Sequence, residues 1–146
     1  SARQMYDKTV SYAKDADIIV KAAAVADYRP KNTAENKIKK GAKLEIELEQ
    51  NPDILKKIGE NKGDTVLAGF CMETQNLIEN AKKKLASKNL DIIVANDLSK
   101  EGAGFKGNTN IVTIIDKNGN QKPLDIMEKE EIAHIILDEC IKISKR

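Results

Sequence analysis

The chain has 146 residues, a length that suffices for one domain with a single hydrophobic core. Its 25 basic and 23 acidic side chains leave a net charge of +2, and only 3% of residues are aromatic, which argues against a surface that binds nucleic acid. No apolar run approaches the roughly 20 residues that a membrane-spanning helix requires, and the start at Ser1 suggests part of a longer chain.

The first part of the chain alternates between apolar and polar stretches. Residues 3–14 are predicted to form a helix, because their apolar side chains recur at helical spacing. The apolar run at 17–25 is typical of a strand buried on both faces, and the polar stretch at 27–40 indicates a loop. Apolar and charged residues alternate over 43–49, which predicts a strand with one solvated face.

A second helix is predicted to begin with Asn51 as the N-cap and Pro52 at the first helical position. Buried strands and amphipathic helices then alternate, and Asn118-Gly119 indicates the turn of a β-hairpin. The further predicted elements are strands at 65–70 and 90–95, helices at 74–88 and 128–143, and hairpin strands at 111–115 and 122–124.

This order predicts an α/β domain with a Rossmann-like, three-layer α/β/α architecture, a mostly parallel sheet and a C-terminal β-hairpin. In such sheets ligands bind beyond the carboxyl ends of the strands. Unusual residues follow three of the predicted strands at that edge, at 24–28, 70–74 and 96–97. We therefore expect the functional site there, within a single domain that spans residues 1–146 and is incomplete at its N-terminus.

Two groups of lysines are candidates for binding an anion, and each also has a purely structural interpretation. Lys37, with Lys39 and Lys40 beside it, can grip a polyphosphate, although the spacing alone favours a solvated basic loop. Lys84 and Lys88 lie one helical turn apart, so they either form half of an anion pocket or make up the wet side of a helix.

Other polar residues leave the reaction undetermined. A carboxylate at Asp27, just after a strand, can bind a ribose hydroxyl, a base edge or a metal ion, or can stabilise a turn. Phe70 either stacks on a base or packs in the core. Cys71 and Cys140 are expected to be buried, reduced thiols of a cytoplasmic protein, and His134 is expected to be exposed. No metal ligands, Walker A loop, G-x-G-x-x-G motif or nucleophile–His–carboxylate set can be assigned.

Taken together, several of these segments resemble the synthetase domain of bacterial phosphopantothenoylcysteine synthetase. They occur in the order of that family and span nearly the whole chain. No single segment is specific, but the set as a whole is. The matching segments are 22–30, 37–40, 51–54, 69–70 with 73–74, 88–91 with 94–97, and 104–105.

The resemblance implies a ligase of coenzyme A biosynthesis that joins 4′-phosphopantothenate to cysteine. In the bacterial family the pantothenate carboxylate attacks the α-phosphate of CTP to give an acyl-cytidylate, and the cysteine amine then displaces CMP. Such chemistry requires alignment and charge neutralisation more than a protein nucleophile. A divalent cation, typically Mg²⁺, shares the phosphate charge.

The family pattern also implies roles for residues of this chain. It makes Lys37 the catalytic residue, which meets the phosphates and stabilises the transition state at the α-phosphate. The implied nucleotide site consists of Ala22, Ala23, Ala24 and Asp27 at the cytidine, Phe70 at the base or ribose, Pro52, Asp53, Ile54 and Leu55 at a helix start, and Lys37, Lys84 and Lys88 at the triphosphate.

The family begins with a strand, a Gly-rich turn and an Asn-containing segment that helps to form the phosphopantothenate site. Because this chain starts after them, we expect it to bind CTP without catalysing the full reaction alone. Family members are dimers and many carry a flavin-dependent decarboxylase upstream, so the resemblance implies a homodimer with no FMN on this chain. The competing hypotheses are a non-catalytic nucleotide-binding module, an NAD-linked Rossmann-type oxidoreductase and a structural interaction domain.

Overall fold

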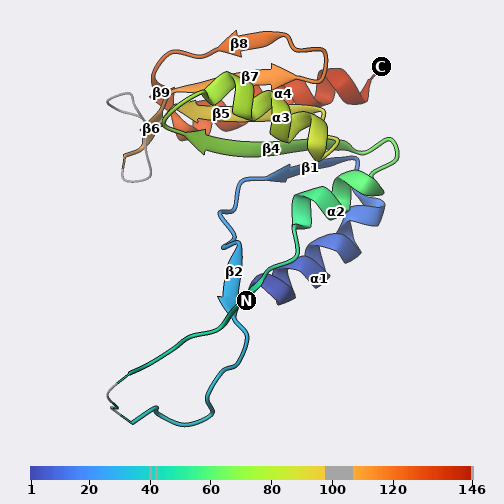
Figure 1. Cartoon of the computed structure of the whole chain (residues 1–146). Helices are drawn as coiled ribbons and strands as arrows, with labels where there is room; N and C mark the ends of the chain where they lie inside the picture. The colour runs from blue at the N-terminus through green and yellow to red at the C-terminus, as the bar shows by residue number, and fades with distance from the viewer. Residues whose placement is uncertain (40, 42, 98–106, 146) are drawn as a thin grey trace.

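The computed structural model describes residues 1–39, 41, 43–97 and 107–145, and its centre is a five-stranded sheet of order β1-β4-β5-β7-β8 (Figure 1). Strands β1, β4 and β5 run parallel to one another. Strand β7 pairs antiparallel with both β5 and β8. The predicted α/β class and C-terminal hairpin are therefore confirmed, with a sheet that is mixed. Its strands are β1 (Ile18–Lys21), β4 (Val66–Glu73), β5 (Ile92–Asp97), β7 (Val112–Asp116) and β8 (Gln121–Pro123).

Helices cover both faces of this sheet and bury a separate hydrophobic core on each. On one face the core includes Leu67 and Ile93 and is covered by α1, α2 and α3. On the other face Ile136 and Cys140 of α4 pack against the sheet. These are the three layers that the sequence predicts. The helices are α1 (Ala2–Tyr12), the short 3₁₀ helix η1 (Ala13–Asp15), α2 (Ile54–Glu60), α3 (Leu77–Ser87) and α4 (Lys129–Ser144).

Strand β5 explains why the sequence of the central strands is continuously apolar. Successive side chains of a strand point to opposite faces. Ile92 and Val94 accordingly lie in the core beneath α4, and Ile93 and Ala95 lie in the core beneath the other helices. All four side chains are buried, so the strand has no solvated face.

A two-stranded arm projects from the sheet, and it differs from the predicted elements. The predicted strand at 17–25 ends at Lys21, and the predicted loop at 27–40 contains β2 (Tyr28–Pro30). That strand pairs antiparallel with β3 (Leu48–Gln50), which coincides with the strand predicted at 43–49 only at residues 48–49. We use the name arm for residues 28–39, 41 and 43–50.

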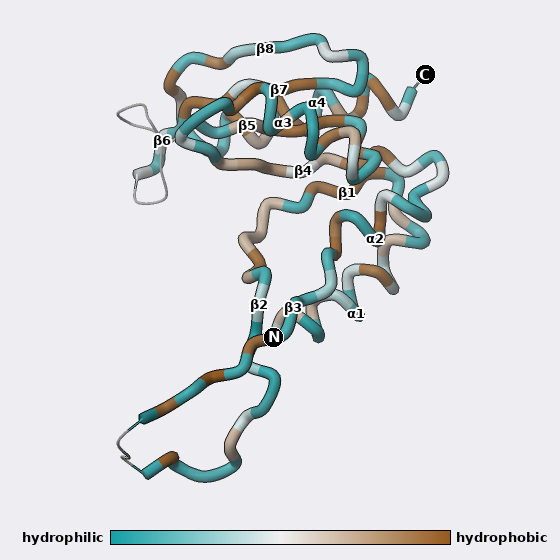
Figure 2. Tube along the Cα trace, in the orientation of Figure 1, coloured by the Kyte–Doolittle hydropathy of each residue, from teal (hydrophilic) through white to brown (hydrophobic). Residues whose placement is uncertain are grey.

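The predictions fail in the arm because its alternating pattern has no core to face. Leu44, Ile46 and Leu48 are 65%, 64% and 56% exposed. Figure 2 shows hydrophobic stretches of the arm well away from the sheet and its two cores. The sequence does alternate between apolar and charged residues, but no described residues cover the apolar side chains of the arm.

The start of α2 also differs from the prediction. The N-cap is Asp53, whose side chain accepts a hydrogen bond from the N–H of Lys56, and the helix begins at Ile54. Asn51 is instead engaged by the arm and by the segment before it: its Nδ2 donates to Ala26 O over 2.8 Å, and its Oδ1 accepts from Arg29 over 2.8 Å. A tertiary contact thus removes the cap that the local sequence predicts.

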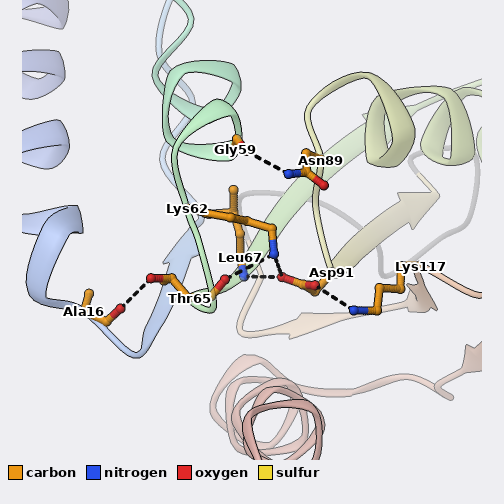
Figure 3. A network of polar contacts seen from close by, with 8 residues as sticks. All are labelled: Ala16, Gly59, Lys62, Thr65, Leu67, Asn89, Asp91 and Lys117. Carbon is orange, nitrogen blue, oxygen red and sulfur yellow. Dashed lines mark hydrogen bonds and ion pairs between the residues drawn. The ribbon is translucent and has the colours of Figure 1, made fainter. Parts of the chain in front are cut away.

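A polar network centred on Asp91 lies at the amino-terminal end of the parallel strands (Figure 3). Asp91 is 3% exposed and accepts hydrogen bonds from Lys62 Nζ over 2.7 Å and from the N–H of Leu67 over 2.9 Å. Lys117 Nζ approaches the other carboxylate oxygen at 3.4 Å. Because a buried carboxylate is tolerated only when it is paired and hydrogen-bonded, we assign this network a structural role.

Candidate functional site

A cavity of about 370 Å³ opens at the carboxyl ends of β1 and β4, the edge at which the sequence predicts the site. Its walls come from the segment after β1, the residues that lead into α2, the end of β4, and α3. We call it the lysine cavity. The predicted nucleotide-binding residues that line it are Ala23, Ala24, Asp27, Pro52, Asp53, Ile54, Phe70, Lys84 and Lys88.

Three of the predicted site residues lie elsewhere. Ala22 lines a second cavity beside α4, and Leu55 is buried in the core. Lys37 is exposed in the arm and is not among the described residues that line the lysine cavity. Lys40 and the family match at 104–105 lie outside the described residues. The structure therefore brings Lys84 and Lys88 together and leaves Lys37 apart from them.

Lys88 is held at the cavity by the residue that caps α2. Its Nζ lies 2.8 Å from Asp53 Oδ2, while Asp53 Oδ1 accepts the N–H of Lys56. Burial by itself would raise the pKa of Asp53, but the hydrogen bonds from Lys88 and from the Lys56 N–H outweigh it, so the pKa is lowered. Asp53 therefore stays ionised at neutral pH and positions the ammonium group of Lys88.

Lys84 is held in a similar way by the last residue of β4. Its Nζ lies 2.7 Å from Glu73 Oε1, and both side chains are partly exposed. Ion pairs of such exposure typically contribute only about 0–1 kcal/mol to stability. A more highly charged anion can therefore replace Asp53 and Glu73 as the partner of Lys88 and Lys84 at a small cost in free energy, because these ion pairs are weak.

A third lysine of the cavity, Lys21, escaped the sequence-based prediction. It is the last residue of β1, and its Nζ donates to the carbonyl oxygen of Ala23 over 3.0 Å. Burial lowers the pKa of Lys21, as does the positive charge of Lys88, while Asp53 and Asp27 act in the opposite sense. The available signal was a lysine inside an apolar run, which is unusual unless its head group reaches a cavity or solvent.

Another part of the cavity wall is fixed by contacts of Asn51. Its N–H donates to the carbonyl oxygen of Asp27 over 2.7 Å, and its side chain donates to Ala26. Arg29 links Asn51 to the base of the arm and also pairs with Glu49 over 2.8 Å. These contacts hold the segment after β1 against the segment before α2, and so they set the shape of the cavity.

Nucleophilic chemistry by the protein is not supported at this site. Burial raises the pKa of Cys71, which lines the cavity, to about 11, so its thiol is protonated at neutral pH. Cys71 and Cys140 are buried and His134 is exposed, as the sequence predicts. Among the described residues there is no group of three or more His, Cys, Asp or Glu side chains that can hold a metal ion.

The arrangement suits an anionic ligand with an apolar or aromatic part. Three lysines line the cavity, and Phe70 offers a partly buried ring at its edge. Lysine ammonium groups bind phosphates as point charges, and several of them together offset a polyphosphate better than one. Within the described part of the chain, no helix is both long and apolar enough to span a membrane.

The chain is similar to known proteins of one family over nearly its whole length. Residues 1–143 match the family described as the DNA/pantothenate metabolism flavoprotein C-terminal domain. The chain is 46% identical over 147 residues to the coenzyme A biosynthesis bifunctional protein CoaBC of Bacillus subtilis (strain 168), covering 100% of this chain and 36% of that protein. It matches the crystal structure of the C-terminal domain of CoaBC with a TM-score of 0.80 and 37% identity, covering 100% of this chain and 64% of that chain.

A further relative carries a different name. The chain is 40% identical over 145 residues to a cysteine/cysteine sulfinic acid decarboxylase from an unknown prokaryotic organism, covering 98% of this chain and 40% of that protein. The chain thus spans less than half of the length of either curated relative. The activity in each name is that of the longer protein, and the shared part is the domain described above.

Proposed function

This chain belongs to the DNA/pantothenate metabolism flavoprotein C-terminal domain family, and from that premise we propose that it binds CTP and helps to join 4′-phosphopantothenate to cysteine in coenzyme A biosynthesis. The observation that carries the proposal is the lysine cavity, where Lys21, Lys84 and Lys88 meet at the carboxyl ends of β1 and β4. The names of the CoaBC relatives support the pathway, and the proposed use of CTP rests on the family resemblance.

The proposed reaction has two steps. An oxygen of the pantothenate carboxylate attacks the α-phosphorus of CTP; the new O–P bond forms as the bond to the bridging oxygen breaks, and pyrophosphate leaves. The cysteine amine then attacks the acyl carbon, CMP leaves, and the amine loses a proton. In the first step, fixed positive charges at the phosphates lower the barrier because they need no reorganisation as charge develops.

The cavity lysines perform this role by exchanging partners. Without a ligand, Asp53 and Glu73 neutralise Lys88 and Lys84. A triphosphate brings more negative charge than either carboxylate and accepts charge-assisted hydrogen bonds from both lysines. Asp27 also lines the cavity, and we propose that it contacts the cytidine. The protein thus aligns the nucleotide and offsets its charge.

Mg²⁺ fits this site as a companion of the nucleotide. Such ions are usually held by substrate phosphates with one or two carboxylates and several waters. Asp27 lines the cavity, and we propose that its carboxylate contacts the ion or a ribose hydroxyl. When bound, the ion shares the phosphate charge with the lysines.

The catalytic role proposed for Lys37 stays a prediction from the family resemblance. Lys37 lies in the exposed arm, apart from the lysine cavity. It can reach the α-phosphate only if the arm moves toward the cavity or if it serves the cavity of another protomer. In the second route Lys37 would contribute to turnover in the assembly and not to nucleotide affinity in an isolated protomer.

We also propose that the protein is a cytoplasmic homodimer that associates through the arm. The family resemblance is the reason to propose a dimer. The exposed side chains of Leu44, Ile46 and Leu48 offer an apolar surface through which two arms can associate. The name bifunctional of the CoaBC relatives supports a second domain in the longer protein. An upstream flavin-dependent decarboxylase is the proposed identity of that domain.

Calorimetric titration with CTP, ATP and NAD, each with Mg²⁺, tests the proposal. We expect CTP to bind and Lys88→Gln to weaken it about tenfold, equivalent to about 1.4 kcal/mol. Lys83→Gln is the matched control, because Lys83 pairs with Glu79 at the surface of α3, the helix that Lys88 follows, and does not line the cavity. Preference for NAD favours an oxidoreductase, and failure of all three to bind contradicts the proposal.

A further inference from the structure

One side chain, that of Arg29, binds three consecutive residues at the base of the arm. Its Nη1 donates to Asn51 Oδ1 over 2.8 Å and to the carbonyl oxygen of Gln50 over 3.1 Å. Its Nη2 pairs with Glu49 Oε1 over 2.8 Å, and the side chain is only 22% exposed. A planar guanidinium donates to several acceptors from one fixed position. Arg29 therefore fixes the chain where it leaves β3 and continues toward α2.

The amide of Asn51 extends this constraint to the segment after β1. Its Oδ1 accepts from Arg29, its Nδ2 donates to the carbonyl oxygen of Ala26 over 2.8 Å, and its backbone N–H donates to that of Asp27 over 2.7 Å. Turning the amide over would place its NH2 group against the guanidinium and its oxygen against the Ala26 carbonyl, and both contacts are unfavourable. The guanidinium therefore selects the amide orientation that holds Ala26.

Arg29 is not among the described residues that line the lysine cavity, whereas the residues that it holds do line it. Ala26, Asp27, Gln50 and Asn51 all belong to the cavity wall. Arg29 thus influences the cavity through its neighbours. Loss of the guanidinium would release the two chain segments that form this part of the wall, and the position of Asp27, which we propose to contact the nucleotide, would no longer be fixed.

The same contacts connect the arm to the cavity. Strands β2 and β3 pair antiparallel with Arg29 opposite Glu49, and Figure 2 shows the two strands at the base of the arm. Asn51 follows β3 directly, and Asp27 precedes β2 directly. A rotation of the arm therefore displaces both of these cavity residues. By linkage, a ligand that fixes the cavity wall must also stabilise the base of the arm.

We propose that Arg29 is a positioning residue for nucleotide binding, which holds the amide of Asn51 in place and so couples the arm to the lysine cavity; this inference rests on the proposed function. A purely structural ion pair would behave differently. It would contribute to the free energy of unfolding, but its removal would leave nucleotide affinity unchanged in the folded protein. The coupling also requires that the arm respond to the ligand, whereas a structural pair requires no such response.

Substitutions of Arg29 test the role of its guanidinium. Arg29→Met keeps an unbranched apolar stem and removes every donor, so we expect calorimetry to show CTP binding about tenfold weaker. Arg29→Lys keeps the charge but cannot reach three acceptors at once, so we expect a smaller loss of about threefold. Lys31→Met is the matched control, because Lys31 pairs with Glu47 across the arm, is half exposed and does not line the cavity. Its CTP affinity should equal that of the wild type.

A double-mutant cycle tests whether Arg29 acts through Asn51. Asn51→Ala removes the amide that Arg29 orients. In that background Arg29→Met should cause little further loss of CTP affinity, because residues that act through one contact have non-additive effects. A loss that is fully additive with that of Asn51→Ala would show that Arg29 acts by another route, and it would overturn the inference.

Hydrogen exchange tests the coupling between the cavity and the arm. We expect saturating CTP to slow amide exchange at residues 27–31 and 47–51 in the wild type and in Lys31→Met. This protection should largely disappear in Arg29→Met, even at a CTP concentration that saturates the variant. Equal protection of these residues in the wild type and Arg29→Met would contradict the coupling.

The outcomes separate this inference from the proposed function. Unchanged CTP affinity in Arg29→Met overturns the inference, even if the variant is less stable, and leaves the proposed function standing. Absence of CTP binding by the wild type overturns both. If circular dichroism shows that Arg29→Met does not fold, Arg29→Lys decides the question, since a CTP affinity equal to that of the wild type overturns the inference.

Discussion

Asp53 accepts a hydrogen bond from Lys88, so the residue that caps α2 also holds the lysine that follows α3 at the cavity. The same two helices meet again where Asn89 Nδ2 donates to the carbonyl oxygen of Gly59 over 2.8 Å. Helix packing and the charge of the cavity are therefore coupled. A change on the buried side of α2 alters the position of a phosphate-binding group even when it leaves that group intact.

Substitutions of Asp53 separate its capping role from its charge. Asp53→Ala removes the cap and is expected to lower the free energy of unfolding by about 1 kcal/mol. Asn is an equally good N-cap, so Asp53→Asn should retain most of that stability while it releases Lys88. Urea unfolding measures the free energy of unfolding of both variants. Equal losses in the two variants would show that the ion pair, and not the cap, provides the stability.

Gly59 tests the coupling between α2 and Lys88. A Cβ at this position would overlap the carbonyl oxygen of Lys88, a backbone atom that cannot move alone. Gly59→Ala should therefore cost about 1–3 kcal/mol of stability through overpacking, and it should weaken CTP binding because Lys88 is displaced. Gly41→Ala is the control, since a Cβ at Gly41 meets nothing within 4 Å. An equally stable Gly59→Ala protein contradicts the described contact.

The Asp91 network predicts how stability depends on pH. Burial by itself would raise the pKa of Asp91, but hydrogen bonds from Lys62 and the Leu67 N–H outweigh it and lower the pKa below 3.8. A carboxylate with a lowered folded-state pKa contributes stability above its unfolded pKa and loses it as the pH falls through the folded value. The wild type should accordingly lose stability below about pH 4.

Asp91→Asn should remove that dependence. The variant leaves Lys62, whose side chain is 11% exposed, without its counter-ion, so we expect a loss of about 3 kcal/mol at neutral pH. The difference from the wild type should shrink on acidification, as urea unfolding at several pH values can measure. Lys117→Gln is the control, because Lys117 is 57% exposed and contributes little. A constant difference across the pH range would exclude Asp91 as the titrating group.

The arm provides a prediction about association. Replacing Leu44 and Ile46 with Ser removes apolar surface that is exposed within one protomer. If the arm forms the proposed dimer, sedimentation should show a change from dimer to monomer. Because these side chains lie outside both cores, circular dichroism of the sheet and helices should not change. A dimer that persists in the double variant would place the interface elsewhere.

Periodicity was sufficient to predict those elements whose surroundings are set by the sheet. The continuous apolar pattern of β5 and the stripe of α4 that includes Cys140 follow from burial between layers, so local sequence carries the information. Asn51 and Pro52 show the limit. Their pattern is typical of a helix start, but Asn51 is engaged by Ala26 and Arg29, and this contact cannot be read from local sequence.

The candidate site was predictable in part, where its position follows from the sheet or from spacing along one helix. The rule that ligands bind at the carboxyl ends of parallel strands located the lysine cavity, and the spacing of Lys84 and Lys88 placed both on one side of α3. The partner of Lys88 is set by how α2 packs against the end of α3, which no spacing reveals. Lys21 was not identified from the sequence as a site residue, because the apolar run at 17–25 gave no sign that β1 ends at Lys21.

Lys21 provides the final prediction, which concerns nucleotide affinity at alkaline pH. Burial and the charge of Lys88 lower the pKa of Lys21 below 10.5, so its ammonium charge is lost at a lower pH than that of an ordinary lysine. A bound triphosphate stabilises the charged form, so binding should take up a proton and weaken as the pH rises toward that lowered pKa. Lys21→Arg, which stays charged, should show a later decline.

Lys21→Gln should bind CTP about tenfold more weakly at neutral pH, and its affinity should vary less with rising pH, because the titrating group is gone. Calorimetric titrations with CTP over a series of alkaline pH values measure all three proteins. If the wild type and Lys21→Gln show the same pH profile, Lys21 does not contact the phosphates. The cavity would then rely on Lys84 and Lys88 alone among the described residues that line it.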